Sequence, residues 1–132
     1  MADIKKMFGT DPEKEVNGVW QNLGEEVRVL VARLGNKKYN DYVAKLMKPY
    51  RRQMRRGTLK DEIVESSINK ALSKYVLLDW EGLEQHGTPL AYSSEEALRV
   101  LEEFPEFREQ VMEMANELES FQAEEDEESE KN

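Results

Sequence analysis

The chain has 132 residues, of which 39% are apolar and 36% charged, and its net charge is −9. A chain of this length buries roughly 60 to 70% of its unfolded surface, so we expect one compact domain with a modest core. The sequence lacks a run of about 18 apolar residues and the apolar segment of a secretory signal, so we expect no membrane span. It contains no cysteine, which rules out disulfides and thiolate sites and is typical of a cytoplasmic protein.

Opposite charges gather in different parts of the chain. Residues 36–60 contain nine basic residues and one acidic residue, a net charge of +8. Residues 79–119 contain two arginines and twelve acidic residues, a net charge of −10, and residues 120–132 add −5 from six acidic residues and Lys131. Because these segments attract one another between copies as well as within one, we expect a homo-oligomer.

The N-terminal part predicts a flexible arm over residues 1–14 and a β-hairpin over residues 15–34. Val27, Val29 and Val31 alternate with other residues in the period-two pattern of a strand. Residues 16–23 can pair with this strand across a turn at Gly24. Asn36 then has the side chain to cap a following helix.

The next segment predicts an amphipathic helix over residues 37–56. Its apolar side comprises Tyr39, Val43, Leu46, Met47, Tyr50 and Met54, and its basic side comprises Lys38, Lys45, Lys48, Arg52, Arg55 and Arg56. Pro49 is expected to kink or split this helix, and Gly57 to end it. A second helix is expected over residues 59–78, capped by Thr58 with Asp61.

The C-terminal part predicts an ordered loop over residues 79–92 and two helices over residues 94–104 and 105–121. Ser93 and Glu96 have the spacing of a capping box, and Pro105 favours a first helical turn. We expect residues 122–132 to be an acidic, disordered tail. The predicted fold is therefore α+β and mostly α-helical, with an N-terminal hairpin, about four helices and one domain over residues 15–121.

No motif predicts catalysis. The single histidine, His86, lies near Asp79, Glu81 and Glu84, but on a glycine-bordered loop that favours solvated side chains over a metal or acid–base site. The sequence lacks a phosphate loop, a nucleophile elbow and an H-E-x-x-H motif. We therefore expect no enzymatic activity, no cofactor and no metal.

Seven residues are candidates for binding a protein partner. An exposed tryptophan or a methionine-rich surface commonly binds varied apolar partners, since methionine repacks easily, and arginine adds charge. The candidates are Trp80, Leu83, Tyr92, Met112, Met114, Arg52 and Arg55. Plain core packing is the competing interpretation for the apolar members of this set.

The basic side of helix 37–56 supports an alternative, a small acidic adaptor or regulator that contacts nucleic acid or protein there. Its tyrosines lie on or beside the apolar side, where packing explains them, and the acidic remainder of the chain competes for the basic side. A protein-facing or solvated role is therefore favoured over nucleic acid.

Four segments carry a resemblance to a known family. They are R-L-G-N-K-K-Y, V-L-L-D-W-E-G-L, P-L-A-Y-S-S-E-E-A-L and F-P-E-F-R. From about Gly18 to Phe121 the chain resembles the tail assembly chaperones of long-tailed bacteriophages. The matching scaffold positions are Trp80, Gly82, Leu83, Pro89, Tyr92, Ser93, Ala97, Leu98, Pro105 and Phe107.

The resemblance implies a function without catalysis. Such chaperones bind the tape measure protein, keep it soluble and help recruit tail tube subunits during assembly. They self-associate, act in the host bacterial cytoplasm and are expected to be absent from the finished virion. Many occur in two forms related by a programmed ribosomal frameshift, and this chain would correspond to the shorter form.

Overall fold

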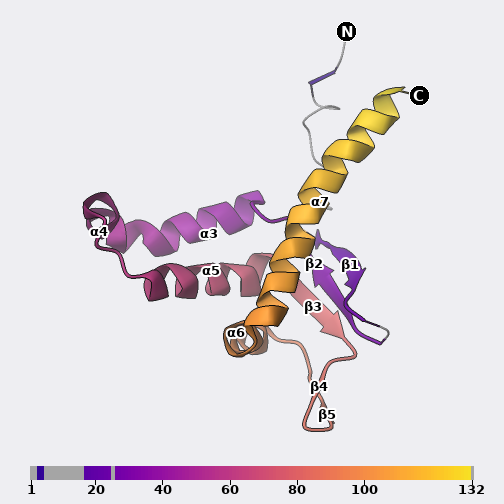
Figure 1. The fold of residues 1–132 in the computed structure, drawn as a ribbon, viewed down its shortest axis with the longest axis horizontal. Coiled ribbons are helices and arrows are strands. Elements are labelled where there is room, and N and C mark those ends of the chain that lie inside the picture. Colours follow the sequence, from indigo (N-terminus) through magenta and orange to yellow (C-terminus); the bar gives the residue numbers. More distant parts are fainter. Residues whose placement is uncertain (1–2, 5–16, 25, 132) are drawn as a thin grey trace.

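The computed structural model of the chain describes residues 3–4, 17–24 and 26–131, with side chains described as far as Leu118. It confirms the predicted α+β, mostly helical fold (Figure 1). The elements in chain order are β1 (Val19–Asn22), β2 (Arg28–Val31), α3 (Lys37–Met47), the 3-10 helix η1 (Lys48–Tyr50), α4 (Arg51–Arg56), α5 (Asp61–Tyr75), β3 (Leu77–Glu81), β4 (Glu84–Gln85), β5 (Thr88–Pro89), α6 (Ser94–Glu103) and α7 (Pro105–Lys131). Most of the predicted arm over residues 1–14 lies outside the described residues.

The predicted hairpin is confirmed, and a third strand joins it. β1 pairs with β2, and β2 pairs with β3, so the antiparallel sheet has the order β1-β2-β3. The prediction of helix up to residue 78 was wrong, because α5 ends at Tyr75 and residues 77–81 form β3. The predicted loop over residues 79–92 likewise contains the end of β3 and the short strands β4 and β5. Pairing with β2 satisfies the backbone groups of residues 77–81, which the sequence alone does not reveal.

An irregularity in β3 places two large side chains on one face of the sheet. Val31 is opposite Leu77 and Val29 is opposite Trp80, with a register shift between Leu30 and Val31. A regular strand would send residues 77 and 80 to opposite faces, because side chains alternate. The shift lets both pack beside the buried valines of β2.

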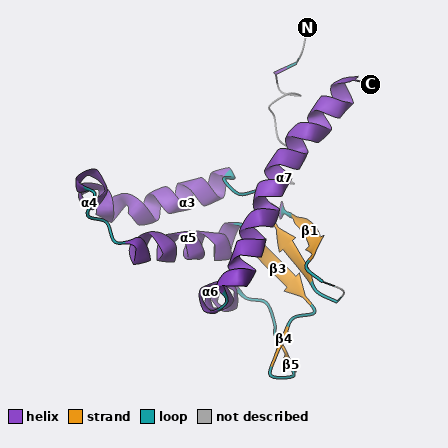
Figure 2. Ribbon diagram, viewed as in Figure 1, coloured by secondary structure: helices purple, strands orange, loops and turns teal. Residues whose placement is uncertain are grey.

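Helices cover that face and complete the core (Figure 2). The buried cluster draws on β2, β3, α5, α6 and α7, and its members are Val29, Val31, Leu72, Val76, Leu77, Trp80, Ala97, Val100, Leu101, Val111 and Ala115. The core therefore lies where the sheet meets these three helices. The paired helices α3 and α5 extend away from it (Figure 1).

The boundaries of α3 and α4 follow local chemistry as predicted. The Asn36 side chain accepts a hydrogen bond from the Tyr39 amide at 3.0 Å, and it donates to the carbonyl of Tyr75 at 3.0 Å. Pro49 lies in η1, which separates α3 from α4, and Gly57 ends α4 in the left-handed conformation with φ +69°. The predicted Thr58 cap was wrong: Lys60 precedes α5, and the Thr58 amide donates back to Gln53.

The two C-terminal helices also begin where predicted. The Ser93 hydroxyl accepts from the Glu96 amide at 3.0 Å, and Pro105 is the first residue of α7. The Glu96 carboxylate does not complete the predicted capping box; it accepts a hydrogen bond from Arg99 at 2.6 Å instead. The structure continues α7 to Lys131. The helix therefore includes the segment for which the sequence predicts disorder, and that disorder stays a prediction.

Candidate protein-binding surfaces

Trp80 belongs to the core. Its side chain is 4% exposed, and the indole N–H donates to the carbonyl of Leu90 at 2.8 Å. Its ring meets that of Tyr92 edge to face, with the centroids 5.1 Å apart. These contacts attach the loop after β3 to the sheet, and direct contact between the Trp80 ring and a partner would require this packing to open.

Tyr92 holds the C-terminal end of the same loop against the sheet. Its hydroxyl donates to the carbonyl of Leu77 at 2.7 Å. Burial first, and the negative charge of Asp79 second, raise the pKa of Tyr92 to about 12. The hydroxyl therefore keeps its proton over the physiological range and remains a hydrogen-bond donor.

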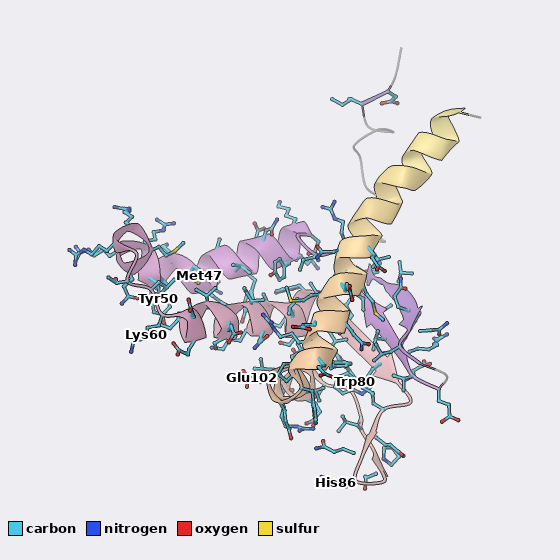
Figure 3. All side chains as sticks on the ribbon, viewed as in Figure 1. Met47, Tyr50, Lys60, Trp80, His86 and Glu102 are labelled. Atoms are coloured by element: carbon cyan, nitrogen blue, oxygen red, sulfur yellow. The ribbon has the colours of Figure 1, made fainter. Side chains whose placement is uncertain are left out.

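Leu83, Met112 and Met114 are partly buried and pack against the core. They keep some exposed surface, so their contact with a partner stays a prediction. Arg52 and Arg55 lie on α4, at the far end of the α3–α5 pair, away from Trp80 (Figure 3). The seven predicted residues thus form two separate groups.

The segment 37–75 forms a helical arm, comprising α3, η1, α4 and α5. Of these elements only α5 has fully buried residues; α3, η1 and α4 have none. Near the base of the arm, the rings of Tyr42 and Tyr75 meet edge to face at 5.4 Å. Towards its tip, Leu46, Met47 and Tyr50 are half-buried and Met54 is 52% exposed. The apolar side of α3 is therefore only partly covered by α5.

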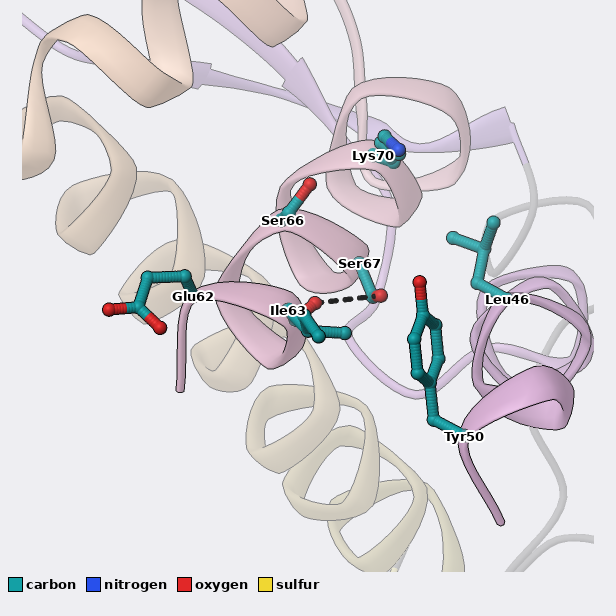
Figure 4. A pocket seen from close by; sticks show the side chains of 7 residues that line it. All are labelled: Leu46, Tyr50, Glu62, Ile63, Ser66, Ser67 and Lys70. Atoms are coloured by element: carbon teal, nitrogen blue, oxygen red, sulfur yellow. Dashed lines mark hydrogen bonds between the residues drawn. The ribbon is translucent and has the colours of Figure 1, made fainter. Parts of the chain in front are cut away.

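A shallow groove of about 220 Å³ runs between α3 and α5 near the tip (Figure 4). Its lining comprises Leu46, Tyr50, Glu62, Ile63, Ser66, Ser67 and Lys70. The Ser67 hydroxyl donates to the carbonyl of Ile63 at 2.9 Å, so it is satisfied within its own helix. The sequence-based candidates omitted this groove, although Leu46 and Tyr50 were predicted to lie on the apolar side of a helix.

The opposite side of the arm is strongly basic. All nine Lys and Arg side chains of residues 36–60 are exposed. Within the part of the chain that the structure describes, none of them forms an ion pair or a side-chain hydrogen bond. The arm therefore presents positive charge that no described residue neutralises by contact.

The acidic helices α6 and α7 present exposed negative charge. Arg99 hydrogen-bonds Glu96, Glu103 and Gln85, at 2.6 Å, 2.6 Å and 2.8 Å. The hydrogen bond to Glu96, more than the other contacts, raises the pKa of Arg99. Arg108 donates to Asn69 at 2.5 Å. Both arginines are thus engaged internally, and exposed glutamates remain, among them Glu102 (Figure 3), Glu106, Glu109 and Glu113.

His86 lies at the turn between β4 and β5, with φ +54° and an exposed side chain. Among the described residues, no three His, Asp or Glu side chains are placed to hold a metal ion. No helix in the described ranges has the length and apolar composition needed to cross a membrane.

Comparison with known proteins identifies the family. Residues 34–132 match the family described as YdaY prophage protein, and the chain belongs to this family. No curated protein and no solved structure matches the chain.

Proposed function

We propose that this member of the YdaY prophage family is a tail assembly chaperone without enzymatic activity. It binds the tape measure protein, keeps it soluble and helps recruit tail tube subunits. Membership of a prophage family and the resemblance across residues 18–121 support the proposal. The structural observation that carries it is the arm, whose first helix leaves its apolar side partly uncovered.

An uncovered apolar side suits a helical client. A tape measure helix that has not yet been packaged exposes an apolar stripe, and a groove on a partner can shield it. The groove of about 220 Å³ is smaller than the roughly 300–1,000 Å³ of small-molecule pockets. It fits individual side chains of a protein better than a free metabolite, and exposed Met54 extends the apolar surface beside it.

Self-association belongs to the same proposal. The basic arm of one copy can approach the acidic α6 and α7 of another. Among the described residues, the basic side chains of residues 36–60 form no ion pair, and several glutamates of α6 and α7 are exposed. Exposed ion pairs contribute at most ~1 kcal/mol each and are screened by salt. The homo-oligomer should therefore dissociate as salt is raised, which sedimentation at low and high salt would detect. A longer frameshifted form would share the same arm.

Co-expression with the cognate tape measure protein tests the function. We expect the tape measure protein to move into the soluble fraction and to co-purify with this chain. Ser66→Trp should fill the groove and reduce the soluble fraction. Glu65→Trp adds the same side chain at the adjacent position, which does not line the groove, and should leave solubility unchanged.

Two results would contradict these expectations. Equal solubility of the tape measure protein with and without this chain would remove the chaperone proposal and favour the adaptor alternative. Equal effects of the two tryptophan variants would instead show that the tape measure protein does not bind in the groove. A thermal melt of each variant shows whether the fold is intact.

A further inference from the structure

We propose that the arm also binds nucleic acid, through the phosphate backbone and without regard to base sequence. The surface is the basic face, which comprises Lys37, Lys38, Lys45, Lys48, Arg51, Arg52, Arg55 and Arg56. This activity is separate from the proposed binding of the tape measure protein, because none of the residues of the basic face lines the groove. It uses the same basic face as the proposed self-association.

The basic face is one-sided and long. At about 100° per residue, Lys37, Lys38 and Lys45 fall within an arc of about 100° on α3, and the four arginines of α4 fall within about 140°. The eleven residues of α3 extend about 16 Å at ~1.5 Å per residue, and η1 and α4 add basic side chains beyond its end. A duplex carries one phosphate charge per about 1.7 Å of its axis, so several phosphates lie within reach of the face.

The charge pattern is unfavourable without a partner. Arg51 and Arg55, and Arg52 and Arg56, are like-charged pairs four residues apart on α4. Each such pair destabilises an isolated helix by roughly 0.2–0.5 kcal/mol. A bound polyanion would relieve this repulsion.

The acidic remainder of the chain does not cancel the basic face. Figure 1 shows α4 at the free end of the arm, whereas α7 crosses the molecule at the base of the arm. At physiological salt, charges separated by more than about 8 Å are largely screened. A phosphate chain at the arm tip therefore experiences mainly the local positive charge.

The chemistry of the face favours phosphates over a protein partner. Protein interfaces rely on buried apolar or aromatic anchors, and the basic face has no large apolar side chain. A second copy's glutamates would supply only exposed ion pairs, which are weak. A nucleic acid also releases condensed counterions, and arginine binds phosphate in a bidentate manner.

The same geometry predicts how the binding discriminates among nucleic acids. Tyr39, Tyr42 and Tyr50 are partly buried, with Tyr42 against Tyr75 and Tyr50 lining the groove, so they do not offer stacking surfaces beside the basic face. Base stacking is what favours single strands on aromatic platforms. We therefore expect duplex DNA to bind at least as well as a single strand, and changes of base sequence to have little effect.

Fluorescence anisotropy with a labelled DNA duplex and the full chain tests the proposal. If four phosphates are neutralised, affinity should fall about 100-fold between 50 mM and 200 mM salt. The triple variant Arg52→Gln, Arg55→Gln, Arg56→Gln should weaken binding at least ~10-fold at 50 mM salt. The control Arg28→Gln, Lys74→Gln, Arg99→Gln removes the same charge outside the basic face and the groove, and it should bind like the original chain.

Three outcomes would overturn the proposal: no duplex binding at 50 mM salt, the same loss in both triple variants, or binding of a polyglutamate peptide of equal charge as tightly as the duplex. The last result would assign the face to acidic proteins. Each leaves the chaperone test unaffected, because Ser66→Trp acts on the groove. Thermal melts confirm that both variants fold.

Discussion

The two halves of the molecule use their apolar residues differently. Where the sheet meets α5, α6 and α7, side chains such as Val29, Leu77 and Val111 are fully buried. In α3, η1 and α4 none is. Burial contributes most to stability, so the first region holds the fold together. The arm retains apolar and charged surface that remains available to partners.

Asn36 connects the two regions. It is 1% exposed, and it donates to the carbonyls of Arg33 at 2.8 Å and Tyr75 at 3.0 Å. These bonds tie the start of α3 to the end of α5. The base of the arm is therefore fixed to the core, while its tip has few buried contacts. Regions of this kind open locally at low cost in free energy.

The largest expected effect comes from truncating a large side chain of the core. Trp80→Ala should lower the free energy of unfolding by about 3–5 kcal/mol, because it leaves a cavity and an unpaired Leu90 carbonyl. Met54→Ala at the arm tip should change it by less than about 0.5 kcal/mol. Urea unfolding of both variants measures the difference. Similar losses would contradict the division of the molecule into a stabilising core and an exposed arm.

Two glycines sharpen the comparison at the level of the backbone. A Cβ at Gly82 would lie 2.0 Å from the carbonyl oxygen of Glu26, with φ +85°. At Gly57, φ is +69° but no atom lies within 4 Å of a Cβ. Gly57→Ala should lower the free energy of unfolding by about 1–2 kcal/mol, because alanine disfavours a positive φ. Gly82→Ala should lower it more, because the loop must also shift to make room for the Cβ. Thermal melts giving the reverse order would refute this.

Raising the pH should lower the stability of the core through the ionisation of Tyr92. The pKa of tyrosine in an unfolded chain is about 10, and in the fold that of Tyr92 is about 12. The unfolded state therefore loses its proton first, so stability is full below pH 10 and decreases as pH rises from 10 to 12. Discounted for partial exposure, the loss is on the order of 1 kcal/mol.

Unfolding measured from pH 9 to 12 checks this expectation, with Tyr92→Phe as the control. The variant should show a smaller slope. Some slope should remain, because burial also raises the pKa of Tyr39, against a smaller lowering by Arg108. An unchanged slope in Tyr92→Phe would show that another group titrates.

The smallest expected effect lies at the arm tip. Arg52→Gln with Arg55→Gln should change stability by less than about 0.5 kcal/mol, because neither guanidinium has an ion-pair partner among the described residues. The sign should be slightly stabilising at low salt, since like-charge repulsion decreases. Calorimetry at two salt concentrations measures it. A clear loss of stability would point to a structural role for these arginines.

Short-range chemistry made much of this fold predictable. Asn36 and Ser93 offer oxygen acceptors to free amides at helix starts, Pro49 interrupts a helix, and Gly57 accepts a left-handed conformation. Each of these outcomes depends on the residue itself and its nearest neighbours. The alternating valines likewise predicted the strand β2.

Long-range contacts decided what the sequence alone did not. The segment 77–81 has no alternating pattern, because the register shift against β2 places Leu77 and Trp80 on one face. Its residues were therefore assigned to the end of a helix and the start of a loop. Trp80 became a core residue through Leu90 and Tyr92, which the chain brings to it from the following loop. The groove between Leu46 and Ile63 and the partial cover of α3 depend on how two helices pack. Local sequence sets backbone preferences, but only the assembled structure determines which side chains remain exposed.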